Sequence, residues 1–317
     1  MTDISVVIPF YNEEENLRDL VKQLNEYAIK QNFTINAILV DDGSSDSSVQ
    51  VLREIESNIP LKLVRLSRNY GSHAAIRAGI TQANGRYTMF FSADMQEPFS
   101  VIGEMYYKAC EGYDIVLARR TEKQVSFYER FFSFLYTSLI RKFAVSEYPK
   151  GGANNFLFCS KVRDHLCENI ESNSSIGMQL LSIGFRKAVI DVSIGKRSKG
   201  KSKWTFSKKV KTFFDSFVAF SYFPIRMITV LGIILFTFGF LYALWIIIGV
   251  STGLIIYDTG FPTIVSVLMI GFGLTNFSLG IVAEYIWRIL DVARGRPVFI
   301  IDTIDILTEM EKWTNDN

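Results

Sequence analysis

The chain has 317 residues, and its 34 Lys and Arg against 32 Asp and Glu give a formal net charge of +2. Hydrophobic residues make up 49% of it, with 26 Phe, and the mean hydropathy is +0.19. This composition is too apolar for an ordinary soluble protein, whereas a charged fraction of 21% excludes a pure bundle of membrane helices. The sequence therefore predicts a folded polar domain joined to a smaller membrane part.

Three short apolar runs lie at residues 4–8, 38–40 and 87–91, and each leads into a polar turn. Segments with helical periodicity alternate with them, at residues 16–27, 49–55, 73–83 and 101–111. Such alternation indicates an α/β domain whose parallel sheet is covered by helices on both faces. Because the carboxyl ends of parallel strands face a crevice where ligands bind, the polar turns predict one ligand site.

Five motifs follow one another along the chain. They are Pro-Phe-Tyr-Asn-Glu at 9–13, Asp-Asp-Gly-Ser at 41–44, Arg-Asn-Tyr-Gly at 68–71, Ala-Asp-Met-Gln-Glu-Pro at 93–98 and Arg-Ser-Lys-Gly-Lys-Ser-Lys-Trp at 197–204. The ordered set resembles inverting family-2 glycosyltransferases, in the branch that loads sugars onto polyprenyl phosphates, the dolichol-phosphate mannosyltransferases and bactoprenol glucosyltransferases. The resemblance covers nearly the whole chain. It implies a GT-A domain, Rossmann-like with a mostly parallel sheet, over residues 1–205.

Two aromatic stretches come after the predicted sheet. Residues 126–146 place apolar side chains at helical spacing, with Arg130, Arg141 and Lys142 between them. This pattern is typical of an amphipathic helix in the membrane interface, and a helix packed on the sheet is the alternative. Residues 206–226 mix Lys with Phe, and here we expect a juxtamembrane amphipathic helix.

Two uninterrupted apolar runs occupy residues 227–250 and 262–284. Each holds roughly the 20 residues that a helix needs to cross about 30 Å of hydrocarbon, so a two-helix transmembrane hairpin is predicted over residues 227–287. Core helices of this length usually carry a polar stripe, which argues against two buried core helices. The remaining residues, 288–317, are expected to form a cytoplasmic tail.

The distribution of Lys and Arg orients the predicted hairpin. These residues crowd the segment 196–211, and Arg288, Arg294 and Arg296 follow the second run, whereas residues 251–261 contain neither type. Because loops rich in Lys and Arg stay in the cytoplasm, we expect an integral membrane protein with a cytoplasmic catalytic domain and both termini cytoplasmic. The expected location is a bacterial inner membrane.

The resemblance implies a nucleotide-sugar pocket formed by Pro9, Tyr11, Glu13, Asp41, Asp42 and Asp94. Carboxylates suit ribose hydroxyls and the imide N–H of uracil, and Tyr11 offers a flat apolar face, which favours a UDP-sugar. Asp46 either joins this pocket or caps the helix that begins near Ser47.

Asp94 and Gln96 are the expected metal ligands. The leaving diphosphate must be neutralised as the glycosidic bond breaks, and hard divalent cations held by carboxylate or amide oxygens do this. By the period-two alternation of a strand end the two side chains point the same way, so we expect Mg or Mn here, with solvated turn residues as the alternative. The family commonly has Asp at both ends of an Asp-Ala-Asp motif, whereas this chain has Ser92 at the first position.

Cationic side chains are expected to meet the phosphates from the other side; they are Arg119, Arg120, Arg197, Lys201 and Lys203. Guanidinium groups suit bidentate phosphate binding, and Lys supplies a mobile point charge. The basic segment beside Trp204 is interpreted as a lid over the lipid phosphate or the diphosphate. A solvated loop and a binding site for anionic lipid are the alternatives.

Asn154 and Asn155 stand where the family commonly carries a catalytic Asp. An Asn cannot accept a proton at neutral pH, but a phosphate monoester, with a second pKa of about 6, is largely a dianion and attacks without a general base. The two Asn residues therefore fit a lipid-phosphate acceptor better than a sugar hydroxyl. With Asp94, Gln96 and Arg119 they complete the expected catalytic set.

These interpretations converge on an inverting glycosyltransferase of the membrane. We expect it to transfer one hexose or N-acetylhexosamine from a UDP-sugar to polyprenyl (undecaprenyl) phosphate, without a nucleic-acid partner. By resemblance the enzyme is a homo-oligomer, a tetramer. The alternative is a catalytically inactive nucleotide-sugar-binding or lipid-binding subunit of a glycan assembly complex, which Ser92, Asn154 and Asn155 favour and the retained acids oppose.

Overall fold

The structure is a computed structural model that describes residues 2–121, 134, 137–142, 145–149, 153–171, 174–193, 223–252 and 260–309. The chain divides into two compact units. Unit 1 consists of Met1–Ser216 together with Pro297–Asn317, and unit 2 is Phe217–Arg296.

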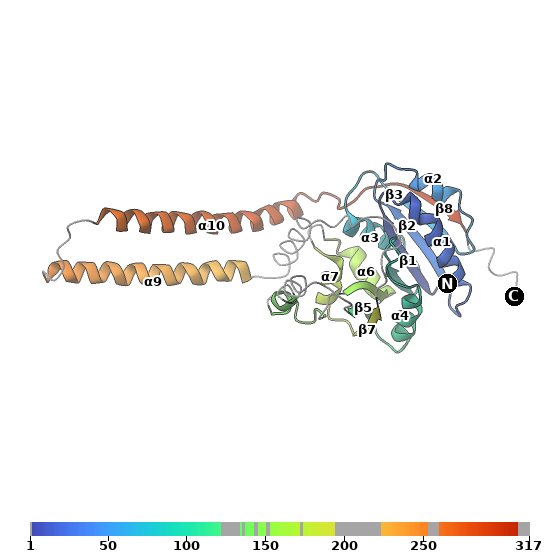
Figure 1. Cartoon of the computed structure of the whole chain (residues 1–317), viewed down its shortest axis with the longest axis horizontal. Helices are drawn as coiled ribbons and strands as arrows, with labels where there is room; N and C mark the ends of the chain where they lie inside the picture. Colours follow the sequence, from blue (N-terminus) through green and yellow to red (C-terminus); the bar gives the residue numbers. More distant parts are fainter. Residues whose placement is uncertain are drawn as a thin grey trace. The chain divides into compact units, whose positions relative to one another are not determined.

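The described residues of unit 1 form one eight-stranded sheet (Figure 1). The strand order across it is β7-β5-β6-β4-β1-β2-β3-β8. The strands are β1 (Ile4–Phe10), β2 (Ile35–Asp41), β3 (Leu61–Leu66), β4 (Tyr87–Phe90), β5 (Ile115–Thr121), β6 (Ala153–Cys159), β7 (Lys187–Ser193) and β8 (Ile301–Thr308). β6 and β8 run antiparallel to their neighbours, and the other paired strands are parallel. The predicted mostly parallel α/β sheet is confirmed.

Helices cover both faces of this sheet. They are α1 (Glu14–Ala28), α2 (Ser48–Arg53), α3 (Ser72–Thr81), α4 (Ser100–Cys110), α6 (Ser160–Glu168) and α7 (Ile176–Ser182). Val6 and Ile8 of β1 belong to a core cluster with side chains of α1 and α4. On the other face α3 lies close to β1, since a Cβ added at Gly79 would stand 2.2 Å from Val7 Cγ1. Burial on both faces explains why β1 reads as a continuous apolar run.

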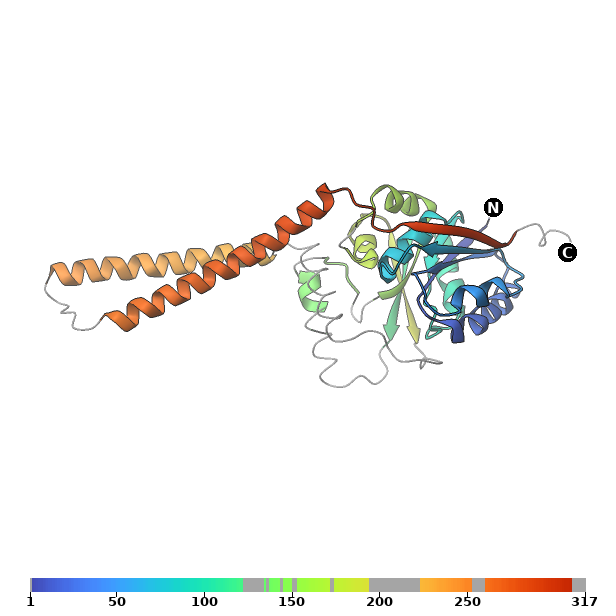
Figure 2. The same ribbon diagram turned by 90° about the horizontal axis from the view of Figure 1, so that it is seen from above.

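The segment predicted as a cytoplasmic tail contains the last strand of the sheet. β8 pairs antiparallel with β3, with Ile304 opposite Val64, and it is drawn in red in Figure 2. Asp305 of β8 accepts a hydrogen bond from Arg53 Nη2 at 2.6 Å, which ties the strand to α2. Residues 301–308 therefore belong to unit 1.

Unit 2 contains two long helices, α9 (Phe223–Ser251) and α10 (Phe261–Ala293). They include both predicted apolar runs and extend beyond them. Many of their large apolar side chains are exposed, Phe238 and Ile289 among them. Among the described residues, however, we find no helix that is both long and apolar enough to cross a membrane, so the predicted transmembrane hairpin is not confirmed.

The two predicted interface helices lie mostly outside the described residues. Residues 137–142 of the first are helical, and Ile140 there is completely buried. Phe134 of the same stretch is exposed, so the choice between an interface helix and a helix packed on the sheet stays a prediction. Of the second, residues 206–226, only the last four are described, as the start of α9.

Candidate active site

The predicted site residues gather at one edge of the sheet. Parallel pairing brings together the carboxyl ends of β1 and β2, where Phe10 is opposite Asp41. β6 runs the other way, so its first residues lie at this same edge, and Asn155 is opposite Ala118. Asp94 follows the end of β4 at this edge. The structure thus brings acids, amides and cations from six strands to one side of the sheet. Three of these strands, β1, β2 and β4, are those whose polar turns the sequence predicts to meet there.

The turns after β1 and β2 are bound to each other. Asn12, with a positive φ of 52°, donates its backbone N–H to Ser44 Oγ at 2.9 Å. Its Oδ1 accepts the backbone N–H of Ser45 at 2.8 Å, and Glu13 N–H donates to Ser48 Oγ at 3.0 Å. Tyr11, just before these contacts, has 36% of its surface exposed. The turn that presents the Tyr11 ring is therefore held by hydrogen bonds to the turn after β2 and to the first residue of α2.

Asp41 is completely buried. Its Oδ1 accepts the backbone N–H of Ser44 at 2.8 Å, and its Oδ2 lies 3.6 Å from Arg65 Nε. Among the described residues Oδ2 has no hydrogen-bond partner. In the structure the side chain closes the turn from inside the fold and does not face the crevice.

Asp42 connects the turn 41–44 to the loop 68–71. Its two oxygens accept the backbone N–H groups of Tyr70 at 2.7 Å and Gly71 at 2.9 Å. Burial raises the pKa of this carboxyl, while the two hydrogen bonds lower it. Gly43, with φ 71°, lets the turn approach the same loop, since a Cβ there would lie 2.6 Å from the carbonyl carbon of Arg68. Residues 41–44 and 68–71 are therefore one packed assembly.

Arg68 is an exposed cation at this edge that the sequence analysis does not assign to the site. Its guanidinium carbon lies 4.5 Å from the centre of the Tyr70 ring, a cation–π contact. The Tyr70 hydroxyl is 3.0 Å from Ser67 Oγ. The position of the motif directly after the carboxyl end of β3 is the sequence signal that identifies Arg68 as a candidate phosphate ligand.

The expected metal ligands lie on a loop, not on a strand. β4 ends at Phe90, and Met95 has a φ of 51°. The period-two alternation used to align Asp94 with Gln96 is therefore wrong, because the extended backbone has already ended. The two residues are instead held together by a hydrogen bond from Gln96 N–H to Asp94 Oδ1 at 3.4 Å.

This donor set suits a hard divalent cation that keeps water and substrate oxygens in its shell. It offers one carboxylate and one amide oxygen, with the hydroxyl of exposed Ser92 nearby in the chain. In the described parts of the chain no cluster of three or more His, Cys, Asp or Glu could hold a metal ion.

Asn155 contacts a carboxylate that the sequence analysis does not identify. Its Nδ2 donates a hydrogen bond to Glu97 Oε2, and both residues are buried, at 4% and 8% exposure. The side chain of Asn154 lies outside what the structure describes. Glu97 is missed because a Glu before Pro98 looks like a surface turn residue in the sequence.

Arg119 is paired with an acid in the structure. Its Nε and Nη2 donate to the two oxygens of Asp191 in β7, at 2.6 and 2.8 Å. This bidentate bond raises the pKa of Arg119 and lowers that of Asp191. The remaining expected cations lie outside the described side chains: Arg120, Arg197, Lys201 and Lys203.

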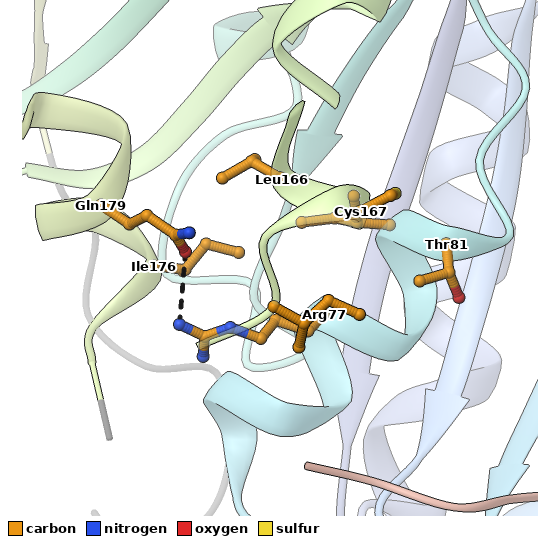
Figure 3. A pocket seen from close by; sticks show the side chains of 8 residues that line it. Arg77, Thr81, Leu166, Cys167, Ile176 and Gln179 are labelled. Carbon is orange, nitrogen blue, oxygen red and sulfur yellow. Dashed lines mark hydrogen bonds between the residues drawn. The ribbon is translucent and has the colours of Figure 1, made fainter. Parts of the chain in front are cut away.

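A buried cation lies behind the site, on α3. Arg77 Nη2 donates to the carbonyl oxygen of Ser174 at 2.9 Å, to its Oγ at 3.0 Å and to Gln179 Oε1 at 3.5 Å. Burial lowers the pKa of Arg77 to about 10. The cavity beside it, shown in Figure 3, measures about 10 Å³, which is room for one water molecule and excludes a nucleotide.

The surroundings of His73, one helical turn before Arg77, should make the stability of the fold depend on pH. Its Nδ1 is buried without a hydrogen-bond partner among the described residues, and burial together with the Arg77 charge lowers its pKa to about 4. In the unfolded chain the imidazole of His73 binds a proton near pH 6.5, whereas in the folded chain it stays neutral until the pH falls to about 4. The contribution of His73 to the free energy of unfolding is therefore complete above pH 6.5 and is lost as the pH falls toward 4. Urea unfolding should show a loss of about 2 kcal/mol between pH 7 and pH 5.

The matched comparison uses the other histidine of the chain. His73→Phe should remove this part of the pH dependence, whereas His165→Gln, at an exposed position of α6, should keep it. If the free energy of unfolding falls equally with pH in the wild-type protein and in His73→Phe, the assignment of a buried, neutral imidazole at His73 is wrong.

Comparisons with known proteins show the family of the chain. The profile of Glycosyl transferase family 2 matches residues 5–163. Undecaprenyl-phosphate 4-deoxy-4-formamido-L-arabinose transferase of Proteus mirabilis is 32% identical over 305 residues, which cover 95% of this chain and 93% of that protein. The uncharacterized glycosyltransferase YkcC of Bacillus subtilis is 29% identical over 299 residues, covering 94% and 92%.

Among solved structures, TarS of S. aureus in complex with UDP-GlcNAc aligns with a TM-score of 0.45 at 18% identity, covering 64% of this chain and 62% of that one. The family profile spans half of the chain, and the similarity to the Proteus transferase spans nearly all of it. Together with the mostly parallel sheet and its polar carboxyl edge, these similarities show that the chain belongs to glycosyl transferase family 2 and is a glycosyltransferase.

Proposed function

We propose that the protein transfers one sugar, a hexose or N-acetylhexosamine, from a UDP-sugar to polyprenyl phosphate with inversion at the anomeric carbon. The similarity to the Proteus mirabilis transferase, whose name states an undecaprenyl-phosphate acceptor, carries this proposal because it extends over both units. The products are UDP and a sugar-phosphate-lipid.

The nucleotide end of the donor is assigned to the joined turns after β1, β2 and β3. Tyr11 offers a partly exposed ring, and Arg68 and Tyr70 stand on the loop that Asp42 holds in place. The guanidinium of Arg68 suits a phosphate oxygen. In this assignment Asp42 works through the loop it anchors, because both of its oxygens already accept backbone N–H groups.

The diphosphate is assigned to the loop after β4. Asp94 and Gln96 would hold Mg or Mn there, and the bound ion would neutralise the charge that develops on the leaving diphosphate. The side chains themselves supply a negative oxygen and an amide oxygen from the loop that follows the carboxyl end of β4, beside β1.

The acceptor phosphate attacks the anomeric carbon directly. One of its oxygens forms the new bond to that carbon while the bond to the UDP oxygen breaks, and the electron pair leaves with UDP. Because the phosphate is largely a dianion at pH 7, no side chain has to remove a proton. An amide at Asn155, held by Glu97, is compatible with this step.

Membrane attachment through unit 2 belongs to the same proposal. Exposed apolar side chains along α9 and α10 support it, among them Ile233, Phe238, Phe272 and Ile289. We assign unit 1 and both termini to the cytoplasmic side of a bacterial inner membrane. We also propose that the protein is a homo-oligomer, a tetramer. Retention of the protein in the membrane pellet after alkaline extraction is the expected result, and release into the supernatant would contradict it.

Transfer of radiolabel from a panel of UDP-sugars into organic-extractable lipid tests the reaction. The assay uses purified full-length protein, undecaprenyl phosphate, and Mg or Mn. Label from one donor establishes the reaction and identifies the sugar. UDP binding without transfer from any donor would overturn the proposal and favour the catalytically inactive binding subunit.

A further inference from the structure

Glu97 is a buried carboxylate that the proposed reaction does not use. It stands at the end of the loop 91–97, with 8% of its surface exposed. Its Oε2 accepts a hydrogen bond from Nδ2 of Asn155, which is itself 4% exposed. A carboxylate taken out of water is unfavourable unless hydrogen bonds replace its hydration. The contact therefore points to a role for Glu97 inside the fold.

The hydrogen bond connects two elements that are 58 residues apart in the sequence. Asn155 lies in β6, which pairs with both β4 and β5 in the middle of the sheet. In this pairing Met89 is opposite Leu157 and Ala118 is opposite Asn155. A rigid strand of the sheet thus holds the far end of the loop that leaves β4.

The loop 91–97 is fixed at three points along its length. Phe91 N–H donates to the carbonyl oxygen of Val7 at 2.8 Å, where the loop begins. Met95 Sδ, in the middle, lies 3.6 Å from Gln23 Nε2 of α1. Glu97 is the third point. Asp94 and Gln96 lie between these points, so the three contacts limit where the backbone of the loop can place them.

We propose that Glu97 is a positioning residue, which holds the loop through Asn155 so that Asp94 and Gln96 present their oxygens to a divalent cation and diphosphate. This inference rests on the proposed function, because it uses the metal ligands assigned there. The amide of Asn155 needs an acceptor and not a charge. A neutral acceptor at position 97 must therefore preserve the effect.

The affinity of the full-length protein for Mn²⁺ in the presence of UDP, followed by the EPR signal of free Mn²⁺, tests this role. Glu97→Ala and Asn155→Ala should each weaken Mn²⁺ binding by about tenfold, as loss of an outer-shell partner does. The double variant should be no weaker than Glu97→Ala, because that variant already lacks the contact with Asn155. Glu97→Gln, whose Oε1 still accepts from Asn155, should stay within about twofold of the wild-type affinity.

Glu111→Ala, at an exposed acid just after α4, is the matched control and should bind Mn²⁺ like the wild-type protein. A purely structural Glu97 would lower the unfolding temperature of Glu97→Ala without changing its Mn²⁺ affinity while it is folded. That result would overturn the inference, and so would a Glu97→Gln variant as weak as Glu97→Ala. If Glu97→Ala does not fold, Asn155→Ala alone decides between these outcomes.

Failure of the proposed function gives a different pattern. A wild-type protein that binds Mn²⁺ and UDP but transfers no sugar overturns the proposed transfer, while the differences among the Glu97 variants still support the positioning role. A wild-type protein that binds no Mn²⁺ with UDP overturns the positioning role as well.

Discussion

Asp94→Asn should reduce the rate of sugar transfer by at least about 100-fold. The substitution keeps the size of the side chain and removes the one carboxylate that the loop 91–97 is proposed to offer to a cation. Asp94 is half-buried, and its Oδ1 accepts the Gln96 N–H at 3.4 Å, an interaction that the Asn carbonyl oxygen preserves. The reduced rate therefore measures the lost stabilisation of the leaving diphosphate. The measurement is kcat for label transfer to lipid, with Mn²⁺ affinity in the presence of UDP beside it.

Asp164→Asn is the control for this substitution. Asp164 is an exposed acid on α6 that pairs with its neighbour Arg163 at 2.9 Å. Its loss should leave both transfer and Mn²⁺ binding unchanged. A wild-type rate in Asp94→Asn would remove Asp94 from the metal site and with it the proposed handling of the diphosphate.

Gly43→Ala should unfold at a much lower urea concentration than the wild-type protein. Alanine at a φ of 71° is strained by about 1 kcal/mol. Its Cβ would also lie 2.6 Å from the carbonyl carbon of Arg68 and 2.8 Å from the backbone nitrogen of Asn69, atoms that no side-chain rotation can move. We expect a total loss of about 3 kcal/mol, together with loss of UDP binding as the loop 68–71 is displaced.

Gly112→Ala separates the strain of a positive φ from the clash of the added Cβ with the loop 68–71. Gly112 also has a positive φ, 95°, but a Cβ there would meet only Arg186 Nη1, at an ordinary 3.7 Å. This variant should lose only about 1 kcal/mol and keep UDP binding. If Gly43→Ala is no less stable than Gly112→Ala, the close approach of the two loops is not what requires glycine at position 43.

The parts of the fold that are local in sequence could be predicted. β1, β2 and β4 coincide with the three apolar runs because strands buried on both faces carry no polar alternation. The polar turns after them meet at one edge because parallel pairing leaves them no other place. β8 was not predicted. The alternation of apolar and polar residues in Ile301–Thr308 is itself a strand signal, but the partner of this segment, β3, lies more than 200 residues earlier, so its place in the sheet could not be read from the sequence.

Within the site, residue type was easier to predict than role. Asp41 and Asp42 are adjacent acids with the same signal in the sequence, yet successive residues point to opposite sides at the end of a strand. The first closes a turn from a fully buried position, and the second anchors the loop 68–71. The pairs Glu97 with Asn155 and Arg119 with Asp191 depend on strand neighbours, which a single sequence does not reveal.

The position of β8 in the chain constrains how the protein is made. The first 216 residues of unit 1 leave the ribosome before α9 and α10, and the strand that completes their sheet is synthesised only after both helices. Until then β3 is an edge strand with unpaired backbone groups, the kind of edge that recruits other chains. A fragment that stops before α9 keeps this edge permanently, so it is expected to aggregate even though it contains every assigned catalytic residue. The nascent enzyme must protect the same edge for the time needed to translate 80 more residues of unit 2.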